Sequence, residues 1–221
     1  MEFQQFIADA WAARISIMNG IGHTIVISVL AVVFGTILGI VVGLILTYGH
    51  WTARFIIRIY TDILRGTPVF VLILASFYIL GVIGIHLSAF QAGIFALTLF
   101  CSSHVGEIVR GALQAIPKGQ IEAGKAIGLT FSQIFAYVLL PQALRQMLPT
   151  WVNTATEIVK ASTLLSIIGV VELLLSVQQI ISRNFLSLEF YFFAGFVYFL
   201  INFLIEKLGR AIEKKVAIPS V

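Results

Sequence analysis

The run from Ile15 to Ala53 contains no Asp, Glu, Lys or Arg. At about 1.5 Å per residue, a helix of this length easily crosses a hydrocarbon core about 30 Å thick. The chain as a whole is 59% hydrophobic and only 11% charged, against roughly 25% charged residues in a water-soluble domain. The apolar runs lack the repeated alternation of a transmembrane barrel, which favours helices. The sequence therefore predicts an all-α integral membrane protein.

The charged residues divide this apolar chain into spans and loops. We expect one domain over residues 1–221 with five spans, at about 15–50, 56–85, 89–112, 147–177 and 189–209. Arg and Lys gather after the first span, in a long loop at about 117–146, and in the tail after the last span. Because basic residues favour cytoplasmic loops, we expect an external N-terminus and a cytoplasmic C-terminus. The same bias explains the net charge of +4, so no nucleic-acid partner is expected.

Small residues mark one side of the first span. Gly35, Gly39 and Gly43 recur at every fourth position, which predicts a stripe where another helix approaches closely. A substrate groove is the alternative interpretation of this stripe. Cys101 is the one cysteine of the chain and lies in an apolar run, so we expect it to pack in the core rather than form an intrachain disulfide.

Polar residues within the second and third spans predict local structure. Arg65-Gly-Thr-Pro68 combines a flexible residue with one that lacks an amide donor, so a helix should kink or restart there. His104, Glu107 and Arg110 share one helical face because they are three residues apart. We expect Glu107 and Arg110 to form an ion pair, with a gating role as the alternative. The other histidines are too scattered to predict a metal site.

The loop at about 117–146 carries the clearest local signals. We expect a short helix at about 119–127, ended by Gly128 in the left-handed conformation. A second helix should begin at Thr130, where Thr130 and Gln133 have the spacing of a capping box. Pro141 should stop or kink this second helix.

The same loop resembles a known motif. Glu122-Ala-Gly-Lys-Ala-Ile-Gly128, followed by nine residues and Val138-Leu-Leu-Pro141, is similar to the EAA loop of ATP-binding-cassette importer permeases, E-A-A-x-x-x-G-x₉-I-x-L-P. Gly124 and Val138 replace the second Ala and the Ile of that motif. Further stretches look like the polar amino acid subfamily of these permeases: Arg65–Pro68, Gly106–Gly111, Pro117–Ala123, Leu140–Arg145 and Lys160–Leu164.

The resemblance implies a fold and a set of partners. The fold is the five-span type I importer permease fold, in a prokaryotic inner membrane. The partners are a second permease, identical or homologous, a dimer of cytoplasmic ATPases, and an external solute-binding protein that delivers a polar amino acid. ATP and Mg²⁺ would bind to the ATPase subunits, because this chain has no phosphate-binding loop of the G-x-x-x-x-G-K-[ST] type. We therefore expect a transport subunit without catalytic residues or cofactor of its own.

The resemblance also makes the first short helix of the loop a coupling helix that docks on the ATPase. Its small residues would permit close approach to a groove of the ATPase, and its charged residues would make contacts at the rim of that groove. The residues expected to dock are Glu122, Ala123, Gly124, Lys125 and Gly128.

Ionisable residues inside the fourth span suggest a substrate pathway. Glu157 and Lys160 should lie about 15 to 20 Å along a helix that begins near Met147, at mid-membrane depth. Such residues are costly in hydrocarbon and usually face a bundle interior or an aqueous cavity. One interpretation is a packing ion pair between them; the other is a pathway lined by Asn153, Thr154, Glu157 and Lys160.

The function most consistent with these patterns is inward transport of a polar amino acid by alternating access, driven by ATP hydrolysis on a partner. The alternative is an ion-coupled secondary transporter or channel that uses Glu157 and Lys160. That alternative requires transport by the purified chain without ATP.

Overall fold

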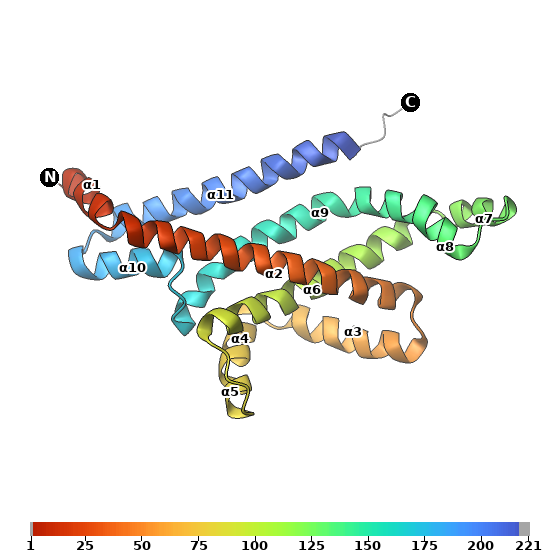
Figure 1. The fold of residues 1–221 in the computed structure, drawn as a ribbon, viewed down its shortest axis with the longest axis horizontal. Helices are drawn as coiled ribbons and strands as arrows, with labels where there is room; N and C mark the ends of the chain where they lie inside the picture. The colour runs from red at the N-terminus through yellow and green to blue at the C-terminus, as the bar shows by residue number, and fades with distance from the viewer. Residues whose placement is uncertain (1, 217–221) are drawn as a thin grey trace.

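The computed structural model of the chain describes residues 2–216, and all regular structure within that range is helical. The helices are α1 (Glu2–Ala12), α2 (Arg14–Tyr48), α3 (Trp51–Gly66), α4 (Val69–Leu74), α5 (Leu80–Val82), α6 (Ala89–Ala115), α7 (Lys118–Ala126), α8 (Phe131–Ile134), α9 (Leu140–Ala161), α10 (Leu173–Asn184) and α11 (Ser187–Val216). Two π-helical segments, Ala75–Ile79 and Phe135–Leu139, and one 3₁₀ segment, Ser162–Ile168, join neighbouring helices. Figure 1 shows α2, α6, α9 and α11 running along the long axis.

Three of the described helices, α2, α6 and α11, are long and apolar enough to cross a membrane. Two bent helix pairs are also long and apolar enough to cross a membrane when the two helices of each pair are taken as one span. One joins Trp51–Gly66 to Val69–Val82 at 109°, and the other joins Phe131–Ile168 to Leu173–Asn184 at 50°. The predicted break at Arg65-Gly-Thr-Pro68 is therefore confirmed, and Thr67 takes the extended conformation that a following proline favours.

The bundle is built around the contact between α2 and α6. A Cβ added to Gly39 would lie 2.6 Å from the Cβ of Val105, and one added to Gly43 would lie 2.5 Å from the Cβ of Val109. A Cβ added to Gly35 would likewise lie 2.5 Å from the Cβ of Cys101. The glycine stripe is therefore the predicted packing seam, and side chains of α6 fill the space that a substrate groove would need. Cys101 is buried in this core, as expected.

The helix that follows the 117–146 loop differs from the prediction. Pro141 does not stop it, because α8, the π-helical turn Phe135–Leu139, α9 and the 3₁₀ segment follow without a break from Phe131 to Ile168. The wider π-helical turn directly before Pro141 accommodates a residue without an amide donor. The helical run therefore begins at Phe131, well before Met147, and the span boundary expected near Met147 stays a prediction.

The end of that span also differs. The expected single span at 147–177 is interrupted, since Gly169 adopts a φ of 83° and α10 begins only at Leu173. Glu172 caps α10: its carboxylate accepts hydrogen bonds from the amides of Leu174 (2.9 Å) and Leu175 (2.8 Å) and from the Tyr198 hydroxyl of α11. Arg183 and Asn184, which lie between the spans expected at 147–177 and 189–209, belong to α10.

Candidate functional site

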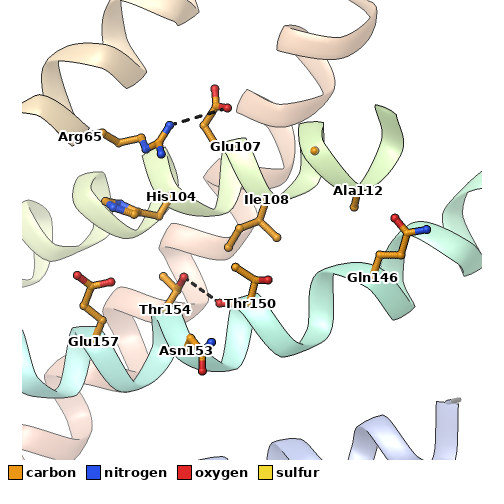
Figure 2. A pocket seen from close by; sticks show the side chains of 11 residues that line it. Arg65, His104, Glu107, Ile108, Ala112, Gln146, Thr150, Asn153, Thr154 and Glu157 are labelled. Atoms are coloured by element: carbon orange, nitrogen blue, oxygen red, sulfur yellow. Dashed lines mark hydrogen bonds and ion pairs between the residues drawn. The ribbon is translucent and has the colours of Figure 1, made fainter. Parts of the chain in front are cut away.

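A cavity of about 570 Å³ lies between α6, α9 and the end of α3. Most of its polar lining comes from α9. Figure 2 shows His104 and Ile108 of α6 facing Thr150, Thr154 and Glu157 of α9. Arg65, Glu107, Gln146 and Asn153 complete its polar lining.

The polar residues of α9 form one continuous stripe. Gln146, Thr150, Asn153, Glu157 and Lys160 are three or four residues apart, so they share a face of the helix, and all five are exposed in the single chain. The opposite face packs in the core through residues such as Met147 and Ile158. A polar stripe on a membrane helix is stable only against water or another protein surface. This face of α9 therefore requires an aqueous cavity or a second subunit beside it.

The four predicted pathway residues do not occupy equivalent places. Asn153, Thr154 and Glu157 line the cavity, whereas Lys160 lies outside its lining. Thr154 is buried and donates its hydroxyl to the Thr150 carbonyl at 3.1 Å. Within residues 2–216, the ion pairs do not include one between Glu157 and Lys160. The carboxylate of Glu157 is therefore free to face the cavity.

Glu107 is the centre of an ion-pair cluster beside the cavity. Its carboxylate lies 2.6 Å from the guanidinium of Arg110, which confirms the predicted pair, and 2.8 Å from that of Arg58. Arg65 approaches to 3.8 Å. The Glu107 side chain is only 12% exposed, so these contacts are partly shielded from solvent. Three arginines around one carboxylate leave an excess of positive charge at this end of the bundle.

Two members of this cluster were not predicted from the sequence. Arg58 and Arg65 lie on α3, far from Glu107 along the chain, and were not predicted to contact it. Their seven-residue spacing, which places both on one helical face, was the available signal. His104, Gln146 and Thr150 were also missed as lining residues.

The predicted coupling segment forms α7, a short helix near one end of the bundle (Figure 1). Gly128 follows it with a φ of 82°, as predicted. The amide of Leu129 bonds to the Gly124 carbonyl and that of Gly128 to the Lys125 carbonyl, both at 3.0 Å, which is the Schellman pattern of helix ends. The next turn has the expected capping box. The Thr130 hydroxyl accepts a hydrogen bond from the backbone N–H of Gln133, and the side-chain oxygen of Gln133 accepts one from the backbone N–H of Thr130.

The exposed face of α7 is not quite the predicted one. Glu122, Ala123, Lys125 and Gly128 are exposed, as docking residues must be. Gly124 is buried, because an added Cβ would lie 2.8 Å from Ile134 of α8. Its small size therefore serves the packing of α7 on α8, and the expected contact of Gly124 with a partner stays a prediction. Ile127, 77% exposed, is an apolar residue on this surface that the sequence reasoning overlooked.

The sequence and structure match one family of membrane proteins. The family described as "Binding-protein-dependent transport system inner membrane component" matches residues 35–218. The chain belongs to this family. It is accordingly a multi-pass inner membrane component of a transport system, and its family is not one of enzymes. Within the described residues, no group of three or more His, Cys, Asp or Glu side chains is arranged to hold a metal ion.

Relatives in this family carry amino acid transport names. The chain is 32% identical to the glutamine transport system permease protein GlnP of Escherichia coli K12, over 94% of this chain and 96% of that protein. It is 33% identical to the L-cystine transport system permease protein TcyB of Bacillus subtilis 168, over 89% and 85%. A solved structure described as an amino acid ABC transporter with histidines superposes with a TM-score of 0.85 at 30% identity, covering 90% of this chain and 94% of that one.

Proposed function

We propose that this permease translocates a polar amino acid inward by alternating access, as the membrane subunit of an ATP-binding-cassette importer. The observation that carries the proposal is the polar face of α9, which lines a cavity within a chain whose relatives are named as glutamine and cystine permeases. Asn153, Thr154 and Glu157 supply hydrogen-bond and charged groups for the ammonium and carboxylate of an amino acid. Lys160 extends the same stripe beyond the cavity lining.

The proposed topology has five spans, with each bent helix pair counted as one. The N-terminus is then external and the C-terminus cytoplasmic, which places α7, Arg54, Arg58 and the basic end of α11 on the cytoplasmic side. The exposed polar stripe of α9 supports a second permease, identical or homologous, since a dimer would enclose the stripe around a shared pathway.

In this topology α7 is the coupling helix. Glu122, Ala123, Lys125 and Gly128 are exposed on it and are proposed to contact the cytoplasmic ATPase dimer, which binds ATP and Mg²⁺. The continuous helix from Phe131 to Ile168 links this contact to the cavity lining. A movement of α7 would therefore be transmitted along α9 to Glu157. An external solute-binding protein would deliver the amino acid at the other end of the bundle.

The test is uptake of glutamine and of cystine into vesicles that contain the permease, its ATPase and its binding protein. Glu157→Gln removes the charge of the cavity carboxylate. We expect uptake to fall roughly tenfold, because a hydrogen bond to a charged group contributes about 1.5 kcal/mol. Asp62→Asn is the matched control, since Asp62 is exposed on α3 outside the cavity lining and should leave uptake unchanged.

Two results would contradict the proposal. Unchanged uptake and selectivity in Glu157→Gln would remove Glu157 from the pathway. Uptake by the purified chain without ATPase or ATP would instead support the ion-coupled transporter.

A further inference from the structure

A second cavity, of about 460 Å³, lies between the end of α2, the beginning of α3 and the end of α6. Its lining shares no residue with that of the cavity between α6 and α9, which is proposed above to carry the amino acid and is called the amino acid cavity here. The second cavity lies at the end of the bundle that carries α7 and α8 (Figure 1). The ring of Tyr48, at the end of α2, packs edge-on against Phe131 of α8 with 5.4 Å between centroids. The transport proposal gives this cavity no role.

The polar wall of this cavity is basic. Arg54 and Arg58 of α3 and Arg110 of α6 line it, and the lining contains no acidic residue. Arg58 and Arg110 both contact Glu107, which lies behind the lining, and Arg110 also donates to Gln114 at 2.7 Å. Arg58 and Arg110 thus share the Glu107 carboxylate with Arg65, whereas among the side chains described, residues 4–215, Arg54 makes no ion pair. The wall has unused donors and an excess of two positive charges.

The other side of the cavity is aromatic and apolar. Trp51 and Phe55 line it, and they are 66% and 63% exposed. The exposed side of α3 continues with Ile56 and Ile59. Tryptophan at such a position is typical of the boundary between hydrocarbon and headgroups. The cavity therefore combines donors for an anion with an apolar edge that meets lipid.

We propose that this cavity binds the phosphate of an anionic phospholipid, with the acyl chains lying along Trp51 and Phe55. Arginine forks match phosphate oxygens in charge and geometry. Basic pockets between membrane helices on the cytoplasmic side suit anionic headgroups. The assignment of this end to the cytoplasmic leaflet rests on the proposed topology. A free anion would use the arginines but not the aromatic edge.

The site has a consequence for the neighbouring cavity. Arg58 and Arg110 face both the second cavity and Glu107, and Glu107 also lines the amino acid cavity. A bound phosphate competes with Glu107 for these guanidinium groups. Removing the Glu107 charge should accordingly strengthen lipid binding, whereas removing a basic group should weaken it.

The experiment counts lipids retained by the purified full chain, using native mass spectrometry after exposure to phosphatidylglycerol, phosphatidylcholine or inorganic phosphate. We expect the unmodified chain to retain phosphatidylglycerol in preference to phosphatidylcholine. Arg54→Gln should lower the affinity for phosphatidylglycerol about fivefold, the contribution of one basic residue near an anionic membrane surface. Arg210→Gln, which removes an exposed arginine of α11 outside the cavity, should leave the affinity unchanged. Glu107→Gln should raise it.

Four results would overturn the assignment. Equal retention of the two lipids, or equal losses in Arg54→Gln and Arg210→Gln, would leave only general attraction to the membrane. Displacement of phosphatidylglycerol by inorganic phosphate at similar concentration would indicate a plain anion site. Normal lipid retention in Arg54→Gln together with loss of the ATPase from the complex would indicate a protein contact. None of these measurements involves uptake, so their failure is distinct from failure of the transport proposal.

Discussion

Substitution of Gly39 by alanine tests whether the α2–α6 seam sets the geometry of the whole bundle. The new Cβ would lie 2.6 Å from the Cβ of Val105 and 3.0 Å from the Ser102 carbonyl oxygen. Ordinary van der Waals contact begins near 3.4 Å, so the helices must separate by about 0.8 Å. Neither obstacle is the mobile tip of a side chain, because one is a Cβ and the other is backbone.

Overpacking of this kind costs about 1 to 3 kcal/mol. For a chain of this size, 1 kcal/mol corresponds to roughly 2 to 4 °C in the midpoint of thermal unfolding. We therefore expect Gly39→Ala to lower the midpoint by about 2 to 12 °C, measured in detergent by the loss of monodisperse protein. Gly22→Ala is the matched control, since Gly22 lies in the same helix and has nothing within 4 Å of an added Cβ.

The control should show an unchanged or slightly raised midpoint, because alanine favours a helix over glycine by up to about 1 kcal/mol. Equal midpoints for Gly39→Ala and Gly22→Ala would refute the reasoning. The glycine stripe would then be a feature of the sequence without a packing role.

Two further predictions concern helix ends. Gly128→Ala forces a side chain into the left-handed conformation, which costs about 1 kcal/mol, and should reduce co-purification of the ATPase; Gly119→Ala, in α7 with open space around it, should not. Co-purification reduced equally by both would show that the conformation at Gly128 is irrelevant. Glu172→Ala removes the cap of α10 and should lower the unfolding midpoint by about 2 to 8 °C, from 1 to 2 kcal/mol. A midpoint within 1 °C of the unmodified chain, on the scale of about 2 to 4 °C per kcal/mol, would mean that the cap contributes little.

Features that depend on neighbours in sequence were predicted well. The apolar runs identified α2, α6 and α11 as membrane helices, since helix formation and hydrophobicity are properties of a local segment. The capping box at Thr130 and the left-handed Gly128 involve residues within one turn of each other. The seam at Gly39 could be predicted because it needs only small residues at helical spacing, whatever the partner helix is.

Features that depend on how helices meet were predicted poorly. The sequence paired Glu107 with Arg110, three residues away, but not with Arg58, which reaches it only because α3 packs against α6. Gly124 was predicted from the sequence as a docking residue, but the sequence did not predict that Ile134 of α8 packs against it. The break at Gly169 carried no strong local signal, since it depends on Glu172 and on the hydroxyl of Tyr198 in another helix.

The sequence by itself determined that this chain is a helical membrane protein and where most of its helices lie, and it predicts which loop carries the coupling motif. These properties follow from the cost of placing polar groups in hydrocarbon and from interactions within a few residues. The tertiary structure decided which faces of the helices meet. It placed Asn153 and Glu157 in the lining of a cavity, left Lys160 outside it, and gathered three arginines from two helices around Glu107. Such arrangements depend on crossing angles and close contacts between distant segments, which local spacing does not specify.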